Sequence, residues 1–182
     1  DEAYIDFGGQ SASALLGKYD NLVVVQTFSK SRSLAGLRVG FALASEAIIS
    51  ILDRVRDAYN VDSLAQVGAL AALEDEDTFL NNTQEIIKTR ANSEASFQDL
   101  NWFTYPSSAN FLFTQPKNNK GVSGPEVAQS LFEHLKSEKV LVRYFGAHPL
   151  TCSFIRVSVG TNHQMESFFG GIKSWQIKES QN

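Results

Sequence analysis

The chain has 182 residues, 43% of them hydrophobic and 20% charged, which is the balance of a globular protein rather than a disordered or fibrous one. Its 16 Lys and Arg residues against 20 Asp and Glu residues give a net charge of −4 without any basic run, which argues against nucleic acid or an anionic membrane as the main partner. The longest apolar stretches fall far short of the roughly 20 residues of a membrane-spanning helix. The single cysteine, Cys152, cannot form an internal disulfide and fits a reducing compartment, so we expect a cytoplasmic protein.

The first elements along the chain are predicted to be two strands and a helix. The aliphatic run at 22–25 is typical of a strand that is covered on both faces in a parallel sheet, and residues 38–44 predict a second strand. Ser45 is placed to cap a helix whose apolar side chains recur at helical spacing. This order of elements predicts part of an α/β domain.

Two further helices are predicted before the middle of the chain. Asp62 can cap a helix that continues to about Leu73. The acidic residues 74–77 mark a polar break, after which a longer amphipathic helix ends near Phe97. This longer helix is expected to connect two domains.

The second half of the chain predicts a smaller α+β domain. Residues 109–114 predict a strand, 117–124 a loop, and Ser123-Gly124-Pro125-Glu126 has the form of a capping box that begins a helix. Residues 140–143 and 154–159 predict two more strands. A last helix is expected to begin at Gly160-Thr161-Asn162.

Residues 27–38 concentrate the polar side chains that could carry chemistry. They directly follow the first predicted strand, and ligands of α/β sheets bind beyond the carboxyl ends of strands. The hydroxyl groups of this segment, together with Arg32 and Arg38, could bind a phosphate group. Neighbouring cations and a dry strand favour the neutral, nucleophilic form of Lys30, although a solvated surface lysine would have the same sequence signature.

Spacing excludes two other kinds of site. A nucleotide-binding P-loop at Lys18 would need glycine at position 12 and serine or threonine at position 19, where the chain has Ala12 and Tyr19. The three histidines show no metal-ligand spacing to one another or to Cys152, so no metal site is expected.

Four short motifs occur in a fixed order along the chain: Asp1-Glu2-Ala3-Tyr4, Thr27-Phe28-Ser29-Lys30, Leu34-Ala35-Gly36-Leu37-Arg38-Val39-Gly40 and Tyr59-Asn60-Val61. This ordered set resembles the pyridoxal-phosphate aminotransferases of fold type I, and most closely the histidinol-phosphate aminotransferases. The resemblance implies an α/β fold with a mostly parallel sheet. Residues 1–80 would form part of the large cofactor-binding domain, and residues 81–182 the connecting helix and a small α+β domain.

The resemblance also implies roles in binding pyridoxal 5'-phosphate. Lys30 would form the Schiff base with the cofactor aldehyde and then move a proton between the substrate Cα and the cofactor C4′. Asp1 would pair with the pyridine nitrogen, and Tyr4 would hydrogen-bond the phenolic oxygen of the ring. A solvated chain end for Asp1 and a packing role for Tyr4 are the alternatives. The residues that would hold the cofactor phosphate are Thr27, Ser29 and Arg38.

Two arginines in the second half are candidates for binding an acidic group of the substrate. Arg143 ends one predicted strand and Arg156 lies on the next, so both could face one cleft, and two guanidinium groups suit a phosphate or a carboxylate. The resemblance implies that Arg156 binds the acidic group and that the pair binds the phosphate of histidinol phosphate. Arg143 could alternatively be an ordinary surface charge.

The resemblance therefore implies an enzyme that transfers an amino group between histidinol phosphate and 2-oxoglutarate in histidine biosynthesis, as a homodimer in the cytoplasm. Two alternatives keep the fold and change the substrate: an aromatic-amino-acid aminotransferase and a threonine-phosphate decarboxylase. A third is the cofactor-sensing domain of a transcription regulator. Because the chain begins at Asp1 without Met, we expect it to be the C-terminal portion of a longer protein. The resemblance implies that half of the cofactor pocket lies upstream of Asp1, so we expect the chain to be inactive alone.

Overall fold

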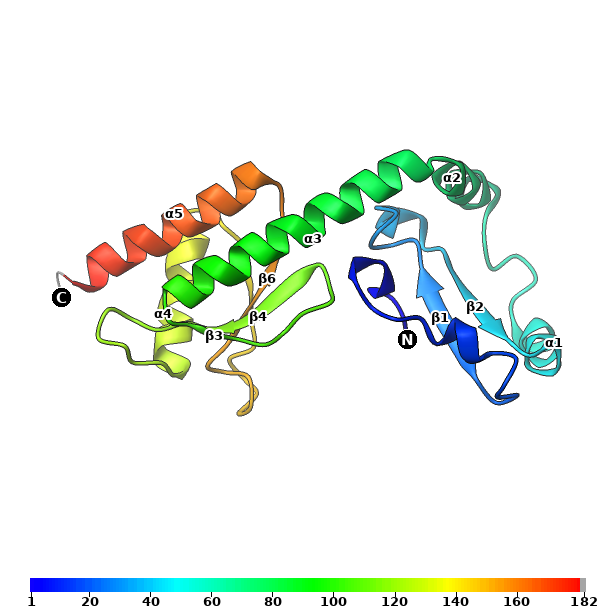
Figure 1. The fold of residues 1–182 in the computed structure, drawn as a ribbon, viewed down its shortest axis with the longest axis horizontal. Helices are drawn as coiled ribbons and strands as arrows, with labels where there is room; N and C mark the ends of the chain where they lie inside the picture. Colours follow the sequence, from blue (N-terminus) through cyan, green and yellow to red (C-terminus); the bar gives the residue numbers. More distant parts are fainter. Residues whose placement is uncertain (181–182) are drawn as a thin grey trace. The chain divides into compact units, whose positions relative to one another are not determined.

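The computed structural model describes residues 1–180 and divides into two compact units (Figure 1). One unit spans Asp1–Gln84 and the other begins at Glu85. Each unit contains one β-sheet, of two strands in the first unit and four in the second.

The sheet of the first unit is an antiparallel pair, β1 (Val23–Thr27) and β2 (Gly40–Ala44). The residues between the strands contain only a short 3-10 turn at Ala35–Leu37, whereas a parallel crossover needs a dozen or more residues and usually an α-helix. The strand predicted at 22–25 is confirmed, but its parallel pairing is wrong. Its burial on both faces is also wrong in this chain, because Val23 and Val25 are 38% and 46% exposed.

Short 3-10 turns precede β1 and an α-helix follows β2. The turns are η1 (Ile5–Phe7) and η2 (Ala12–Leu15), and the helix is α1 (Glu46–Val55). The predicted helix is confirmed, but Ser45 does not cap it with its side chain. Its hydroxyl instead donates a hydrogen bond to the Asp20 carbonyl at 3.0 Å.

Two further helices, α2 (Ser63–Glu74) and α3 (Glu76–Asp99), confirm the remaining helices expected in this half. Asp62 caps α2 as predicted, because its carboxylate accepts a hydrogen bond from the Ala65 amide at 2.9 Å. The polar break between the helices is a single residue, Asp75, whose carboxylate accepts a hydrogen bond from the Thr78 amide at 3.2 Å.

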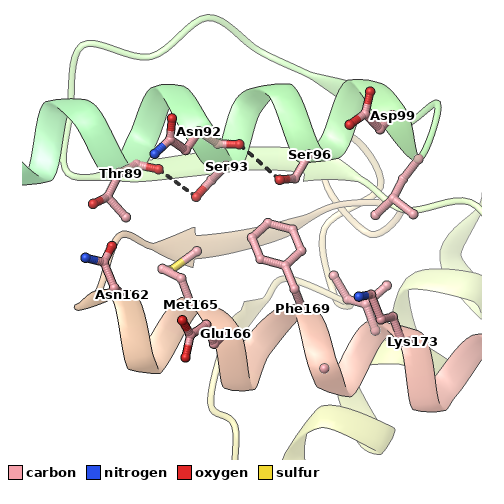
Figure 2. A pocket seen from close by; sticks show the side chains of 13 residues that line it. Thr89, Asn92, Ser93, Ser96, Asp99, Asn162, Met165, Glu166, Phe169 and Lys173 are labelled. Atoms are coloured by element: carbon pink, nitrogen blue, oxygen red, sulfur yellow. Dashed lines mark hydrogen bonds between the residues drawn. The ribbon is translucent and has the colours of Figure 1, made fainter.

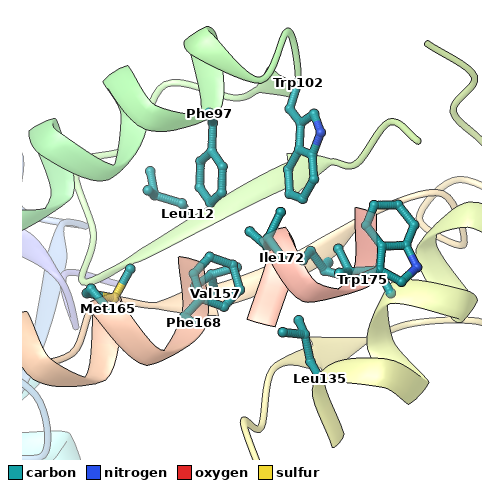
Figure 3. Packing of buried hydrophobic residues seen from close by; sticks show 11 residues of the cluster. Phe97, Trp102, Leu112, Leu135, Val157, Met165, Phe168, Ile172 and Trp175 are labelled. Atoms are coloured by element: carbon teal, nitrogen blue, oxygen red, sulfur yellow. The ribbon is translucent and has the colours of Figure 1, made fainter. Parts of the chain in front are cut away.

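The second unit is an antiparallel sheet in the order β3-β4-β6-β5 with helices packed on one face. Its elements are β3 (Phe103–Thr104), β4 (Phe111–Gln115), α4 (Pro125–Ser137), β5 (Arg143–Tyr144), β6 (Ile155–Ser158) and α5 (Asn162–Glu179). Figure 3 shows the core, in which Leu112 and Val157 of the sheet contact side chains of α3, α4 and α5. The described helices include none that is long and apolar enough to cross a membrane.

The local predictions for the second unit are confirmed in part. The strands expected at 109–114 and 154–159 are present as β4 and β6, and α5 begins where expected, with a capping box between Thr161 and Gln164. The strand β3 was not predicted, because it contains only two residues.

Two boundaries around α4 differ from the prediction. The residue before the helix is Gly124, without a side-chain cap, so the capping box expected at 123–126 is wrong. The strand expected at 140–143 begins only at Arg143. Lys139 adopts a left-handed φ of 62°, and the Val140 amide donates back to the Leu135 carbonyl at 2.8 Å, which ends the helix and delays the strand.

Candidate functional site

Lys30 lies in a tight turn that directly follows β1. The Leu34 amide donates a hydrogen bond to the Phe28 carbonyl at 2.9 Å, and the Ser33 amide donates to the Lys30 carbonyl at 3.0 Å. The Phe28 ring is buried and meets the Phe41 ring of β2 edge to face, with centroids 5.9 Å apart. The fold therefore fixes the backbone of Lys30, while its side chain is half-buried.

Two hydroxyl groups lie on the strand side of this turn. Thr27 Oγ1 accepts a hydrogen bond from the Ser29 amide at 3.1 Å and lies 3.0 Å from Ser29 Oγ. It also lies 3.2 Å from the Val39 carbonyl oxygen. The structure thus brings together Thr27 and Ser29, two of the predicted phosphate anchors, next to Lys30 in the chain.

The N-terminal segment brings Tyr4 to Lys30. Residues 1–7 run beside β1, where the Glu2 amide donates a hydrogen bond to the Val25 carbonyl at 2.8 Å. The Nζ atom of Lys30 lies 5.4 Å from the centroid of the Tyr4 ring, within cation–π range. Two residues far apart in the sequence, both predicted for the site, are therefore neighbours.

The Glu2 carboxylate holds this segment in place and was not predicted from the sequence. It accepts hydrogen bonds from the Ala12 amide at 2.6 Å, Ser11 Oγ at 2.8 Å and Gln26 Nε2 at 2.9 Å. Burial raises the pKa of Glu2, but these hydrogen bonds outweigh it and hold the pKa below its ordinary value. Glu2 is therefore an ionised anchor between Asp1 and Tyr4.

Asp1 and Arg38 are exposed and make contacts within their own loops. Asp1 accepts a hydrogen bond from the Ala3 amide at 2.9 Å. Arg38 adopts a left-handed φ of 56° and donates from Nη1 to the Ala35 carbonyl at 2.8 Å. These contacts are local, so the cofactor roles of both residues stay predictions.

Arg32, which the sequence suggested as a possible phosphate-binding residue, packs against two helices in this structure. Its Nη1 donates to the Ala72 carbonyl of α2 at 2.5 Å, and its guanidinium lies 3.7 Å from the centroid of the Phe79 ring in α3. The side chain therefore ties the Lys30 turn to two helices of the first unit.

Arg143 and Arg156 are neighbours in the second unit. They are directly opposite one another on β5 and β6, so their side chains leave the same face of the sheet. Arg143 is exposed, whereas Arg156 is half-buried and its buried Nε atom has no hydrogen-bond partner among residues 1–180. Because like charges in opposite positions destabilise a sheet, this pair fits an anionic ligand.

Aromatic rings cover the sheet face beside these arginines. Phe113 lies directly opposite Arg156 on β4, and its ring stacks on that of Phe154 with centroids 4.7 Å apart. Further rings in contact with these two are those of Tyr105, Phe145 and Phe103. The sequence analysis did not identify this cluster, although the alternation of aromatic residues at 103 and 105 and at 111 and 113 could have indicated it.

A cavity of about 710 Å³ lies between α3 and α5, away from every predicted site residue (Figure 2). Two of the hydroxyl groups that line it, those of Ser93 and Ser96, bond to the α3 backbone. Ser93 donates to the Thr89 carbonyl at 2.8 Å, and Ser96 donates to the Asn92 carbonyl at 3.0 Å. Within residues 1–180, no cluster of three His, Cys, Asp or Glu side chains could hold a metal ion.

The chain belongs to the aminotransferase class I and II family, whose family model matches residues 1–172. It is 47% identical over 165 residues to histidinol-phosphate aminotransferase 2 of Rhizobium meliloti (strain 1021), an alignment that covers 89% of this chain and 45% of that protein. The family predicted from the sequence is confirmed. The chain spans about half the length of the curated relatives it matches.

Solved structures show the same fold. Histidinol-phosphate aminotransferase from Sinorhizobium meliloti, in complex with pyridoxal-5'-phosphate, has a TM-score of 0.83 at 23% identity and covers 98% of this chain and 48% of its own. L-threonine-O-3-phosphate decarboxylase from Porphyromonas gingivalis has a TM-score of 0.76 at 22% identity, over 96% of this chain and 53% of its own. The predicted α/β fold of these enzymes is confirmed.

Proposed function

We propose that this chain is part of a pyridoxal-phosphate-dependent aminotransferase that exchanges an amino group between histidinol phosphate and 2-oxoglutarate in histidine biosynthesis. The observation that carries the proposal is the Lys30 amine, held in a rigid turn beside the Tyr4 ring and next to two hydroxyl groups. The 47% identity to a histidinol-phosphate aminotransferase supports the choice of substrate.

The donor set at the turn fits pyridoxal phosphate. This cofactor supplies an aldehyde and an electron-withdrawing ring, which together make a proton on the substrate Cα acidic. The amine of Lys30 would hold the aldehyde carbon, and the Tyr4 hydroxyl would bond the phenolic oxygen. Asp1 would keep the ring nitrogen protonated. The phosphate would accept hydrogen bonds from Thr27, Ser29 and Arg38.

Lys30 would also transfer the proton. Once its Nζ atom is released as a free amine, it would take the proton from the substrate Cα and return it at the cofactor carbon C4′. The rigid backbone of the turn supports this role, because proton transfer needs a donor and an acceptor within hydrogen-bond reach.

Arg143 and Arg156 would bind the acidic group of the substrate. Each guanidinium offers a planar set of donors that matches a phosphate or a carboxylate. The unpartnered Nε of Arg156 supports an anion at this position, since a buried polar atom without a partner is costly. The same pair would accept the phosphate of histidinol phosphate and a carboxylate of the oxo acid in alternate halves of the reaction.

The domain organisation and assembly are part of the proposal. Residues 1–80 would belong to the large cofactor-binding domain and residues 81–182 to the connecting helix and the small domain, and the division into compact units within α3 supports this. We expect a homodimer in the cytoplasm. The exposed apolar side chains Val55 on α1 and Leu64 on α2 support a subunit interface.

Covalent labelling of the intact protein tests the assignment of Lys30. Borohydride reduction in the presence of pyridoxal phosphate should leave a stable pyridoxyl group on the peptide that contains Lys30, as measured by mass spectrometry. Lys30→Ala should lose the label and the visible absorbance band of the bound cofactor. Lys18→Ala, which removes an exposed lysine of the same unit, should keep both. A label that remains in Lys30→Ala would contradict the assignment of Lys30 as the residue that binds the cofactor aldehyde.

A threonine-phosphate decarboxylase is the second candidate, because such an enzyme shares the fold and two arginines suit any phosphate-bearing substrate. The products separate the two functions. Histidinol phosphate and 2-oxoglutarate should give glutamate, whereas threonine phosphate would release carbon dioxide. Release of carbon dioxide without formation of glutamate would contradict the proposed aminotransferase and support the decarboxylase.

A further inference from the structure

We propose that Asp6 is a positioning residue for Lys30 and that it acts through Ser31. The inference rests on the proposed function, because it gives Lys30 the role of the reacting amine. It concerns a hydrogen bond between two side chains that are far apart in the sequence: Asp6, which was not predicted for the site, and Ser31, one of the hydroxyl residues of 27–38.

The bond joins the two segments that carry the candidate site. The Ser31 side chain is 5% exposed, and its hydroxyl donates a hydrogen bond to the Asp6 carboxylate. Asp6 lies in η1, between Tyr4 and Phe7, and the fully buried Phe7 ring fixes this turn. Ser31 directly follows Lys30. The segment that presents Tyr4 is therefore tied to the turn that presents Lys30.

The position of Ser31 explains why its anchor matters for Lys30. The Lys30 carbonyl already accepts a hydrogen bond from the Ser33 amide within the turn, and Arg32 is held by Ala72 and Phe79. The Asp6–Ser31 hydrogen bond adds a contact at Ser31, the residue that directly follows Lys30 in the chain. Without it, the Lys30 turn loses a side-chain tie to the segment that presents Tyr4, and small displacements slow a proton transfer strongly.

The charge and the hydrogen bond of Asp6 can be separated by substitution. Asp6 and Arg32 line the same cavity of about 80 Å³ behind the turn, so a charge effect is the competing explanation. Asp6→Asn keeps an acceptor for the Ser31 hydroxyl and removes the charge, whereas Asp6→Ala removes both. Ser31→Ala removes the donor alone. If the hydrogen bond carries the effect, Asp6→Asn should behave as the wild type.

Hydrogen exchange in the intact protein without cofactor provides a readout that is independent of catalysis. We expect Asp6→Ala and Ser31→Ala each to raise amide exchange in residues 28–34 about tenfold, as expected for the loss of one ordinary side-chain hydrogen bond. The double variant should exchange no faster than either single variant, because both remove the same bond. Asp20→Ala, which removes another exposed carboxylate of this unit, should leave the exchange unchanged.

Steady-state kinetics of the cofactor-loaded protein test the role at Lys30. Asp6→Ala and Ser31→Ala should lower kcat about tenfold with little change in KM, and Asp6→Asn should restore kcat. A loss of kcat in Asp6→Asn equal to that in Asp6→Ala, or unchanged exchange at 28–34 in the alanine variants, would overturn the inference. If the wild-type protein is not labelled at Lys30, the proposed function fails separately, and the exchange data decide whether Asp6 holds the turn.

Discussion

The Glu2 carboxylate shows how one side chain can organise a site without touching the reacting atoms. Its three hydrogen-bond donors come from the η2 region and from β1, which are separate parts of the first unit. Together they fix the backbone between Asp1 and Tyr4, the two residues predicted to contact the cofactor ring. Ionisation of Glu2 should therefore contribute to stability.

This contribution should depend on pH. Because the pKa of Glu2 is lower in the folded protein than its ordinary value of 4.5, the stabilisation is present above pH 4.5 and is lost as the pH falls through the folded value. Glu2→Gln should lower the free energy of unfolding by about 1 kcal/mol at neutral pH. The difference from the wild type should shrink below pH 4.5, as measured by thermal unfolding across pH. A difference that stays constant with pH would show that Glu2 does not act through its charge.

At the scale of elements, the local signals for helix caps were confirmed at Asp62 and wrong at Ser45 and at Ser123–Glu126. Asp62 caps its helix as predicted, and Thr161 caps the helix that was expected to begin at 160–162, since each accepts a hydrogen bond from an amide in the first turn. Ser45 does not cap its helix, because its hydroxyl donates a hydrogen bond to the distant Asp20 carbonyl. The pairing of β1 depended on its neighbour in space, so its own sequence could not distinguish parallel from antiparallel pairing.

The packing of α4 against α5 depends on a close approach at Gly171. A Cβ atom at this position would lie 2.7 Å from Leu135 Cδ2, and Leu135 is fully buried, whereas a Cβ at the adjacent Gly170 would meet nothing within 4 Å. Overpacking costs about 1–3 kcal/mol, while alanine gains about 1 kcal/mol over glycine inside a helix. The two neighbouring glycines should therefore respond in opposite directions.

We expect Gly171→Ala to lower the melting temperature of the protein and Gly170→Ala to raise it. Both substitutions add the same methyl group to the same helix, so the difference between them measures the contact with Leu135. Differential scanning calorimetry of the two variants checks the expectation. Equal stabilisation by both would mean that Leu135 moves aside without cost.

At the scale of the whole molecule, the family and the site residues that adjoin Lys30 in the chain could be predicted from the sequence, because the motifs occur in a fixed order. The contact between Tyr4 and Lys30 fits the roles that the resemblance implied for them. The bonds from Asp6 to Ser31 and from Glu2 to Gln26 were not accessible. Short polar side chains in separate segments carry no periodic signature, so only the folded backbone reveals such pairs.

The neighbouring guanidinium groups of Arg143 and Arg156 have a practical consequence for enzymology. If this pair binds the phosphate of the substrate, as proposed, inorganic phosphate in a buffer should compete for the same site. The apparent KM for histidinol phosphate, the proposed substrate, should rise linearly with the phosphate concentration, with kcat unchanged, relative to a zwitterionic buffer of equal ionic strength. Arg156→Gln should weaken the dependence of the apparent KM on phosphate. An apparent KM that does not change with phosphate in the wild type would contradict the prediction. The choice of buffer would then decide the substrate preference that an assay reports.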